Sequence, residues 1–170
     1  MSFLDLFQPK PGVKRIALLV DGPNMIRSQF NVRLEEVLES LSEFGQVRVA
    51  KVFLNQYASD KLIEAISNTG CEPIVMTTDA DVPMAISAMD CIYNPHIDTI
   101  ALMTRDSDLH HVFLKAKEKG KQTILLTADD QLAVSLKNSA DKVIMVKTHA
   151  AEKTKLKPRE EKPKEAGEMK

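Results

Sequence analysis

The chain has 170 residues, of which 44% are hydrophobic and 28% charged, and this length fits one globular domain with a single sizeable core. The formal net charge is −1, which excludes a strongly basic protein, so contact with nucleic acid would require local basic patches. The longest uninterrupted apolar run, residues 16–20, is far shorter than the roughly 20 residues that span a bilayer, so no membrane association is expected. Cys71 and Cys91 form no CxxC motif, and we expect buried thiols in a reducing, cytoplasmic environment.

Strand-like and helix-like stretches alternate along the chain. Apolar, β-rich runs predict strands, and apolar residues at helical spacing predict helices. In chain order, the expected elements are strand 15–21, helix 34–45, strand 46–55, helix 59–70, strand 72–76, helix 81–94, strand 98–104, helix 108–120, strand 122–127, helix 129–141 and strand 142–147. Strict alternation predicts βαβ units. We therefore expect an α/β fold, a three-layer α/β/α sandwich around a central, mostly parallel sheet.

Three regions follow from these patterns. Residues 1–12 are expected to be an N-terminal extension, residues 13–147 the folded domain, and residues 148–170 a charged tail. The tail contains seven Lys or Arg residues and five Glu residues, with only two large apolar residues. It cannot build a core, so we expect it to be solvated.

Aspartates stand beside the ends of the predicted strands. Asp21 ends the first strand, Asp106 and Asp108 follow the fourth, and Asp81 opens the helix after the third. In an open α/β sheet, ligands gather outside the carboxyl ends of the strands, where the strand order reverses. If the first and fourth strands are neighbours, these four carboxylates converge on one rim of the sheet.

Such a convergence predicts a metal site. Crowded carboxylates raise one another's pKa values and cost stability unless a cation lies among them. Hard oxygen ligands with little sulfur or imidazole suit Mg²⁺ or Mn²⁺. An ion held in this way can lower the pKa of a bound water and stabilise the charges that develop in phosphodiester cleavage.

Each aspartate also has a plain structural interpretation. Asp108 and Asp81 could be N-caps of the helices that follow them, and Asp21 before Gly-Pro could make a turn. For any one of them alone the cap or turn is favoured, whereas together at one end of the sheet they favour a site. Asp79 is given only the structural interpretation.

Several motifs resemble those of the NYN domain, a branch of the PIN-like, FLAP-nuclease-related fold, and particularly its archaeal and LabA-like members. The motifs are VDGPNM at 20–25, DADVPMAISAMD at 79–90, IDTIALMTRDSDL at 97–109 and KAKEKGK at 115–121. With the last strand, helix and strand, the resemblance covers about residues 13–147. It implies a PIN-like parallel sheet with an acidic metal pocket, and it implies divalent-metal-dependent ribonuclease activity.

The resemblance assigns roles to individual positions. Asp21, Asp81, Asp106 and Asp108 match acidic metal-site positions and would be both metal ligands and catalytic residues. Asn24 matches a polar residue thought to position metal, water or phosphate. The helix that begins at Asp81 often carries a further acidic residue six positions on, where this chain has Ser87. This departure weakens the case for a second metal.

Basic residues near these motifs are candidates for contact with an RNA backbone. Arg27 and Arg105 are favoured by their positions beside the acidic motifs, ahead of Arg33 and the lysines of residues 115–121. Aromatic residues make up only 5% of the chain, which argues against an extended stacking platform for single strands. Exposed apolar helix faces would be compatible with a homodimer.

Other functions compete with the ribonuclease. A non-catalytic module could use the same pocket to bind metal or RNA, and Ser87 favours that alternative. A phosphatase of the haloacid-dehalogenase type needs an Asp or Thr where Pro23 stands. A receiver domain needs a Lys at the end of its fifth strand, which residues 125–130 do not supply. Dinucleotide binding would need a G-x-G-x-x-G motif, which VDGPNM lacks.

Overall fold

The computed structural model describes residues 12–25, 32–128 and 132–148, and it contains one fully parallel six-stranded sheet. The strands lie in the order β3-β2-β1-β4-β5-β6. Their bounds are β1 Arg15–Asp21, β2 Gln46–Asn55, β3 Glu72–Met76, β4 Thr99–Met103, β5 Gln122–Thr127 and β6 Lys142–Met145. The chain builds outward from β1 to β3 and then returns to the other side of β1, so the strand order reverses between β1 and β4.

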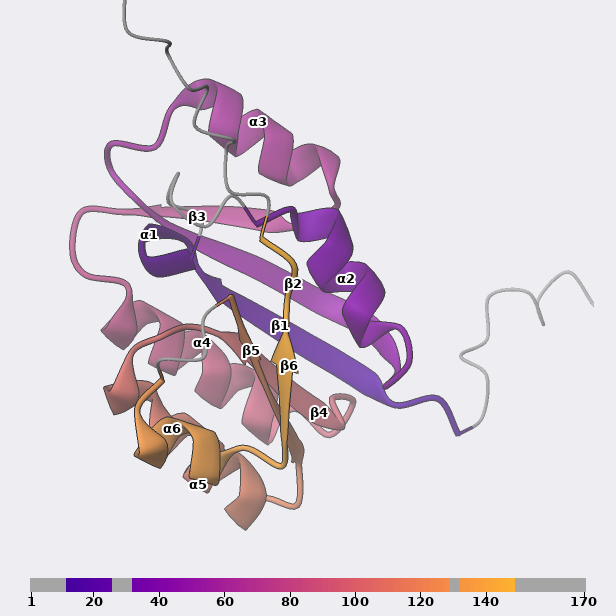
Figure 1. Cartoon of the computed structure of the whole chain (residues 1–170). Coiled ribbons are helices and arrows are strands. Elements are labelled where there is room, and N and C mark those ends of the chain that lie inside the picture. The colour runs from indigo at the N-terminus through magenta and orange to yellow at the C-terminus, as the bar shows by residue number, and fades with distance from the viewer. Residues whose placement is uncertain (1–11, 26–31, 129–131, 149–170) are drawn as a thin grey trace, which may run out of the picture.

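Helices cover both faces of this sheet (Figure 1). One face carries α2 and α3, and the other carries α4, α5 and α6. The bounds are α1 Gly22–Met25, α2 Leu34–Leu41, α3 Asp60–Asn68, α4 Asp81–Tyr93, α5 His110–Glu118 and α6 Val134–Ser139, with a 3₁₀ turn, η2, at Ser107–Leu109. The three-layer α/β/α architecture expected from the alternating pattern is confirmed.

The residues of β1 show why the sheet is buried on both faces. Ile16, Leu18 and Val20 pack in the cluster with α2 and α3, while Ala17 and Leu19 pack in the cluster with α4 and α5. All five side chains are fully buried, because successive residues of a strand point to opposite faces. A strand of this kind must be apolar at every position, which is the pattern seen in the sequence.

Every predicted strand and helix is present, but several are shorter than predicted. The helix predicted at 34–45 ends at Leu41, and that predicted at 129–141 spans only Val134–Ser139, with residues 129–131 outside the described part. Strands β1, β2, β3 and β5 begin and end at the predicted residues, and Ser59 caps α3 by accepting a hydrogen bond from the backbone N–H of Leu62. The helix predicted from residue 108 begins instead with η2, whose N-cap is Asp106. The short helix α1 follows Asp21, at the place where the structural interpretation of Asp21 expected a turn. Within the described residues, no helix has both the length and the apolar composition required to cross a membrane.

Candidate functional site

The carboxyl ends of β1 and β4 bring two buried polar residues together. Val20 pairs with Met103 across the two strands, so the next residues, Asp21 and Thr104, lie side by side at the rim. The Oγ1 hydroxyl of Thr104 donates a hydrogen bond to Oδ2 of Asp21 at 3.1 Å, and both side chains are fully buried. A buried carboxylate is costly unless it accepts hydrogen bonds, so Thr104 holds Asp21 in place.

The same hydroxyl also fixes Asp106. Thr104 Oγ1 accepts a hydrogen bond from the backbone N–H of Asp106 at 3.0 Å, and Asp106 Oδ1 accepts one from the backbone N–H of Asp108 at 2.8 Å. Asp106 is thus the N-cap of η2, and it takes the capping role that one interpretation gave to Asp108. These bonds form a continuous chain from the end of β1 to the start of the turn after β4.

Asp81 joins this group from the first residue of α4. Its pKa is raised from 3.8 to about 6, first by burial, then by a hydrogen bond with the Asp106 side chain and by the negative charges of Asp106, Asp21 and Asp79. The amino end of a helix normally favours an ionised carboxylate, yet here burial and the neighbouring carboxylates outweigh that effect. Asp81 and Asp106 can hydrogen-bond through their side chains only if one of them carries a proton. The capping role considered for Asp81 is wrong, because the N-cap of α4 is Ala80.

A cavity of about 220 Å³ opens at this group. Its lining includes three aspartates, Asp21, Asp79 and Asp81, together with Asn55 and Thr78. The ends of β1, β2 and β3 and the start of α4 therefore contribute to one acidic cavity at the carboxyl rim of the sheet. Ligands of open α/β sheets bind outside this rim, at the point where the strand order reverses, and Asp21 at the end of β1 connects the cavity to that point.

The other predicted site residues have different places. Asp108 is exposed and contacts the group through its backbone N–H. Arg105 is half-buried between Thr104 and Asp106, and Ser87 is half-buried on α4. Asn24 belongs to α1, but its side chain lies outside the described part, as does Arg27.

The lysine-rich stretch 115–121 has structural partners. Lys115 pairs with Glu118, Lys117 pairs with Asp141, and Lys121 donates to backbone carbonyls of residues 94 and 97. These three ammonium groups therefore have acceptors within the fold.

Three residues of the site were missed by the sequence reasoning. Thr104 connects Asp21 to Asp106, Asn55 lines the acidic cavity, and Asp79 raises the pKa of Asp81. Thr104 and Asn55 could have been found by asking which polar residues lie at or just beyond the ends of the strands that flank β1. Asp79, which was assigned no part in the site, stands two residues before Asp81 in the same motif.

The chemical type of the donor atoms suits a hard divalent cation, but their positions among the described residues do not form a metal site. Carboxylate oxygens are what Mg²⁺ and Mn²⁺ prefer, and the charges of Asp106, Asp21 and Asp79 add to burial in raising the pKa of Asp81. In the described part of the chain, however, no three His, Cys, Asp or Glu side chains are grouped so that they could hold a metal ion. An ion would have to draw the carboxylates together as it displaced the proton.

Comparisons with known proteins agree with this fold. The family model of the NYN domain matches residues 15–147. An uncharacterized protein of Methanocaldococcus jannaschii is 50% identical over 137 residues, which cover 81% of this chain and 57% of that protein. A crystal structure of a Vibrio parahaemolyticus protein of unknown function has a TM-score of 0.70 at 16% identity, covers 81% of this chain and 96% of that one, and shows a shared fold. The match over nearly the whole described domain shows that the chain belongs to the NYN domain family.

Proposed function

We propose that this protein is a divalent-metal-dependent ribonuclease that cleaves RNA phosphodiester bonds at the acidic cavity. NYN domains are generally nuclease-like, which supports this chemistry at the level of the family. One observation carries the proposal for this chain. Asp81, Asp106, Asp21 and Asp79 lie close enough together at the carboxyl rim that burial and the neighbouring carboxylates raise the pKa of Asp81 to about 6.

Asp21, Asp81 and Asp106 would hold Mg²⁺ or Mn²⁺, with exposed Asp108 as a further ligand. A divalent ion bound there would lower the pKa of a coordinated water and neutralise charge on the phosphate. Thr104 fixes the Asp21 carboxylate, and the N–H of Asp108 fixes that of Asp106. Hydrogen bonds of this kind orient the ligands of a metal site.

Asp81 lies in the wall of the acidic cavity, at the first residue of α4. It would either hold the ion or orient the attacking water. Asn24, Arg27 and Arg105 would bind the phosphate backbone of the RNA.

The experiment that tests the proposal measures cleavage of end-labelled single-stranded and stem-loop RNA with Mn²⁺ or with chelator. Wild-type protein should cleave only with Mn²⁺, and Asp106→Asn should reduce the rate at least about 100-fold, since even outer-shell changes at metal sites cost about 10–100-fold. Glu64→Gln, an exposed change on α3, is the matched control. Equal cleavage by all three proteins would identify a contaminating nuclease.

A non-catalytic module that binds metal or RNA is the second candidate. Ser87, at a position where the family often has an acidic residue, and the absence of a three-ligand group among the described side chains favour it. It predicts that Asp106→Asn retains the RNA affinity of wild type while neither protein cleaves. A cytoplasmic location and a homodimer stay predictions from the sequence.

A further inference from the structure

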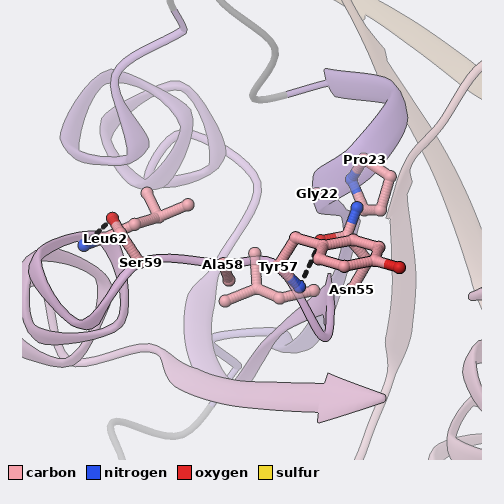
Figure 2. Close-up of a pocket in the computed structure, with 8 residues that line it drawn as sticks. Gly22, Pro23, Asn55, Tyr57, Ala58, Ser59 and Leu62 are labelled. Carbon is pink, nitrogen blue, oxygen red and sulfur yellow. Dashed lines mark hydrogen bonds between the residues drawn. The ribbon is translucent and has the colours of Figure 1, made fainter. Parts of the chain in front are cut away.

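A second cavity, of about 310 Å³, lies next to the acidic one and shares Pro23 and Asn55 with it. We call it the neutral cavity, because all of its lining residues are uncharged: Gly22, Pro23, Leu54, Asn55, Tyr57, Ala58, Ser59 and Leu62. In Figure 2, Pro23, Asn55 and Tyr57 lie on one side of it, and Ser59 and Leu62 lie on the other. Its volume is at the lower end of the range for small-ligand pockets, about 300–1,000 Å³.

Tyr57 is the distinctive side chain of the neutral cavity. It is 83% exposed, more than any other large hydrophobic residue that the structure describes. Its backbone is nevertheless fixed, because its N–H donates to Asn55 Oδ1 at 3.1 Å. A large aromatic side chain that lines a cavity and is left uncovered is suited to stack against a flat ligand.

The lining offers the chemistry that a nucleobase needs. Leu54 and Leu62 provide apolar surface, and the Tyr57 ring provides a stacking face. The Asn55 amide nitrogen can donate hydrogen bonds while its oxygen is bonded to the backbone. The neutral cavity has no carboxylate to repel a base that carries carbonyl groups. The shared wall places a bound base directly beside the acidic cavity, where the phosphate of the same nucleotide would lie.

We propose that the neutral cavity binds one nucleobase of single-stranded RNA, stacked on Tyr57 and next to the phosphate in the acidic cavity. The identity of the polymer rests on the proposed function, whereas the stacking site rests on the geometry around Tyr57. The low aromatic content of the chain argued against an extended platform, and one well-placed ring is enough for one base.

Intrinsic fluorescence can report this contact, because the chain has two tyrosines and no tryptophan. Tyr93→Phe leaves Tyr57 as the only emitter, and Tyr57→Phe leaves Tyr93, which is on α4 and 59% exposed. Titration with a uridylate octamer, in Mg²⁺ and in chelator, should quench Tyr93→Phe and leave Tyr57→Phe unchanged after identical absorbance correction. Equal quenching of both variants would overturn the proposal.

Affinity for the same octamer provides the second readout. Tyr57→Ala should weaken binding about 5- to 150-fold, the range expected for one stacked base. Tyr57→Phe should bind like wild type, and Tyr93→Ala is the matched control that should also bind like wild type. An octamer with one abasic position should lose less affinity for Tyr57→Ala than for wild type. Wild-type affinity in Tyr57→Ala, or no RNA binding by wild type in either solution, would overturn the proposal.

The same experiments separate this site from the nuclease proposal. A gel run after each titration shows whether the octamer was cut. Binding that depends on Tyr57 without any Mn²⁺-dependent cleavage would retain the stacking site and end the ribonuclease proposal. If Tyr57→Ala changes neither the rate and KM of cleavage nor the affinity for RNA, the ribonuclease proposal is retained and the stacking site is rejected.

Discussion

Thr104 donates its hydroxyl hydrogen to a carboxylate oxygen of Asp21, 83 residues earlier in the chain, and no solvent reaches either side chain. The bond joins the ends of β1 and β4 at the point where the strand order reverses. Its geometry also sets the start of η2, because the same oxygen accepts from the Asp106 backbone N–H. Stability and the placement of the acidic group therefore depend on one hydroxyl.

Replacing that hydroxyl should destabilise the protein. Thr104→Val keeps the shape of the side chain but removes the hydrogen bond to Asp21 and the acceptor of the Asp106 N–H, which should cost about 1–3 kcal/mol of unfolding free energy. Thr99→Val is the matched control, because the buried Oγ1 of Thr99 has no hydrogen-bond partner within the described structure. Urea unfolding at pH 7 should show a loss for Thr104→Val and none for Thr99→Val. Equal losses would mean that the hydrogen bonds are not the cause.

The raised pKa of Asp81 predicts the direction in which stability changes with pH. Its value in the folded state, about 6, is above the ordinary 3.8, so the folded protein holds the Asp81 proton more tightly than the unfolded chain does. The stabilisation from protonated Asp81 is complete below about pH 4 and is lost as the pH rises through about 6. Asp81→Asn, which cannot ionise, should be more stable than wild type at pH 7.5 by more than at pH 4.5.

Urea unfolding at the two pH values measures that difference. Asp90→Asn, an exposed change on the same helix, is the control and should follow wild type at both. If Asp81→Asn also follows wild type, the carboxylates of the rim are too well solvated to influence one another.

The sequence could indicate the sheet and the meeting of Asp21 with Asp106, because both follow from the alternation of elements and from the rule that strand ends share a rim. It could not indicate the role of Thr104, which depends on the register of β1 against β4. Nor could it show that Tyr57 stays exposed beside the acidic cavity, since exposure is decided by what packs around a residue. For Asn24 and Arg27 the sequence-based expectations stay predictions.

Addition of Mn²⁺ at pH 7 should raise the melting temperature if the acidic cavity binds the ion. An ion at 100 times its Kd adds about 2.7 kcal/mol to the free energy of unfolding. The shift should shrink at pH 5, where protons compete for Asp81, and should vanish in Asp21→Asn. Glu64→Gln should retain the full shift. If Mn²⁺ does not change the melting temperature at either pH value, the metal-dependent mechanism is contradicted, whereas the description of the fold is not affected.

At the opposite rim, Arg15 and Asp98 join the starts of β1 and β4. Nε of Arg15 donates to Oδ2 of Asp98 at 2.9 Å, Nη2 donates to Oδ1 at 3.1 Å, and the backbone N–H of Arg15 adds a bond of 2.8 Å. These bonds lower the pKa of Asp98 from 3.8 to about 2. The resulting stability is present above pH 4 and is lost as the pH falls through about 2.

Asp98→Asn should therefore lower the unfolding free energy at pH 7 by about 1–2 kcal/mol, as expected for hydrogen bonds to a charged group that is partly solvated. The deficit relative to wild type should shrink as the pH approaches 2. Because this pair lies far from the carboxyl ends of the strands, RNA binding should be unchanged at 25 °C. A deficit that is constant from pH 7 to pH 2 would show that the charge of Asp98 is not what stabilises the pair.

Gly22 follows Asp21 at a point where the chain passes very close to β2. A Cβ atom there would lie 2.4 Å from the carbonyl oxygen of Phe53 and 2.8 Å from Cδ2 of Leu54. The backbone would have to move, so Gly22→Ala should cost about 1–3 kcal/mol through overpacking and should displace Asp21. Gly70→Ala is the comparison, because Gly70 has a φ of +84° but nothing within 4 Å of the added atom. Both variants should melt at a lower temperature than wild type. Only Gly22→Ala should also lose the Mn²⁺-induced rise in melting temperature. If Gly22→Ala retains that rise, β1 can shift without disturbing the acidic cavity.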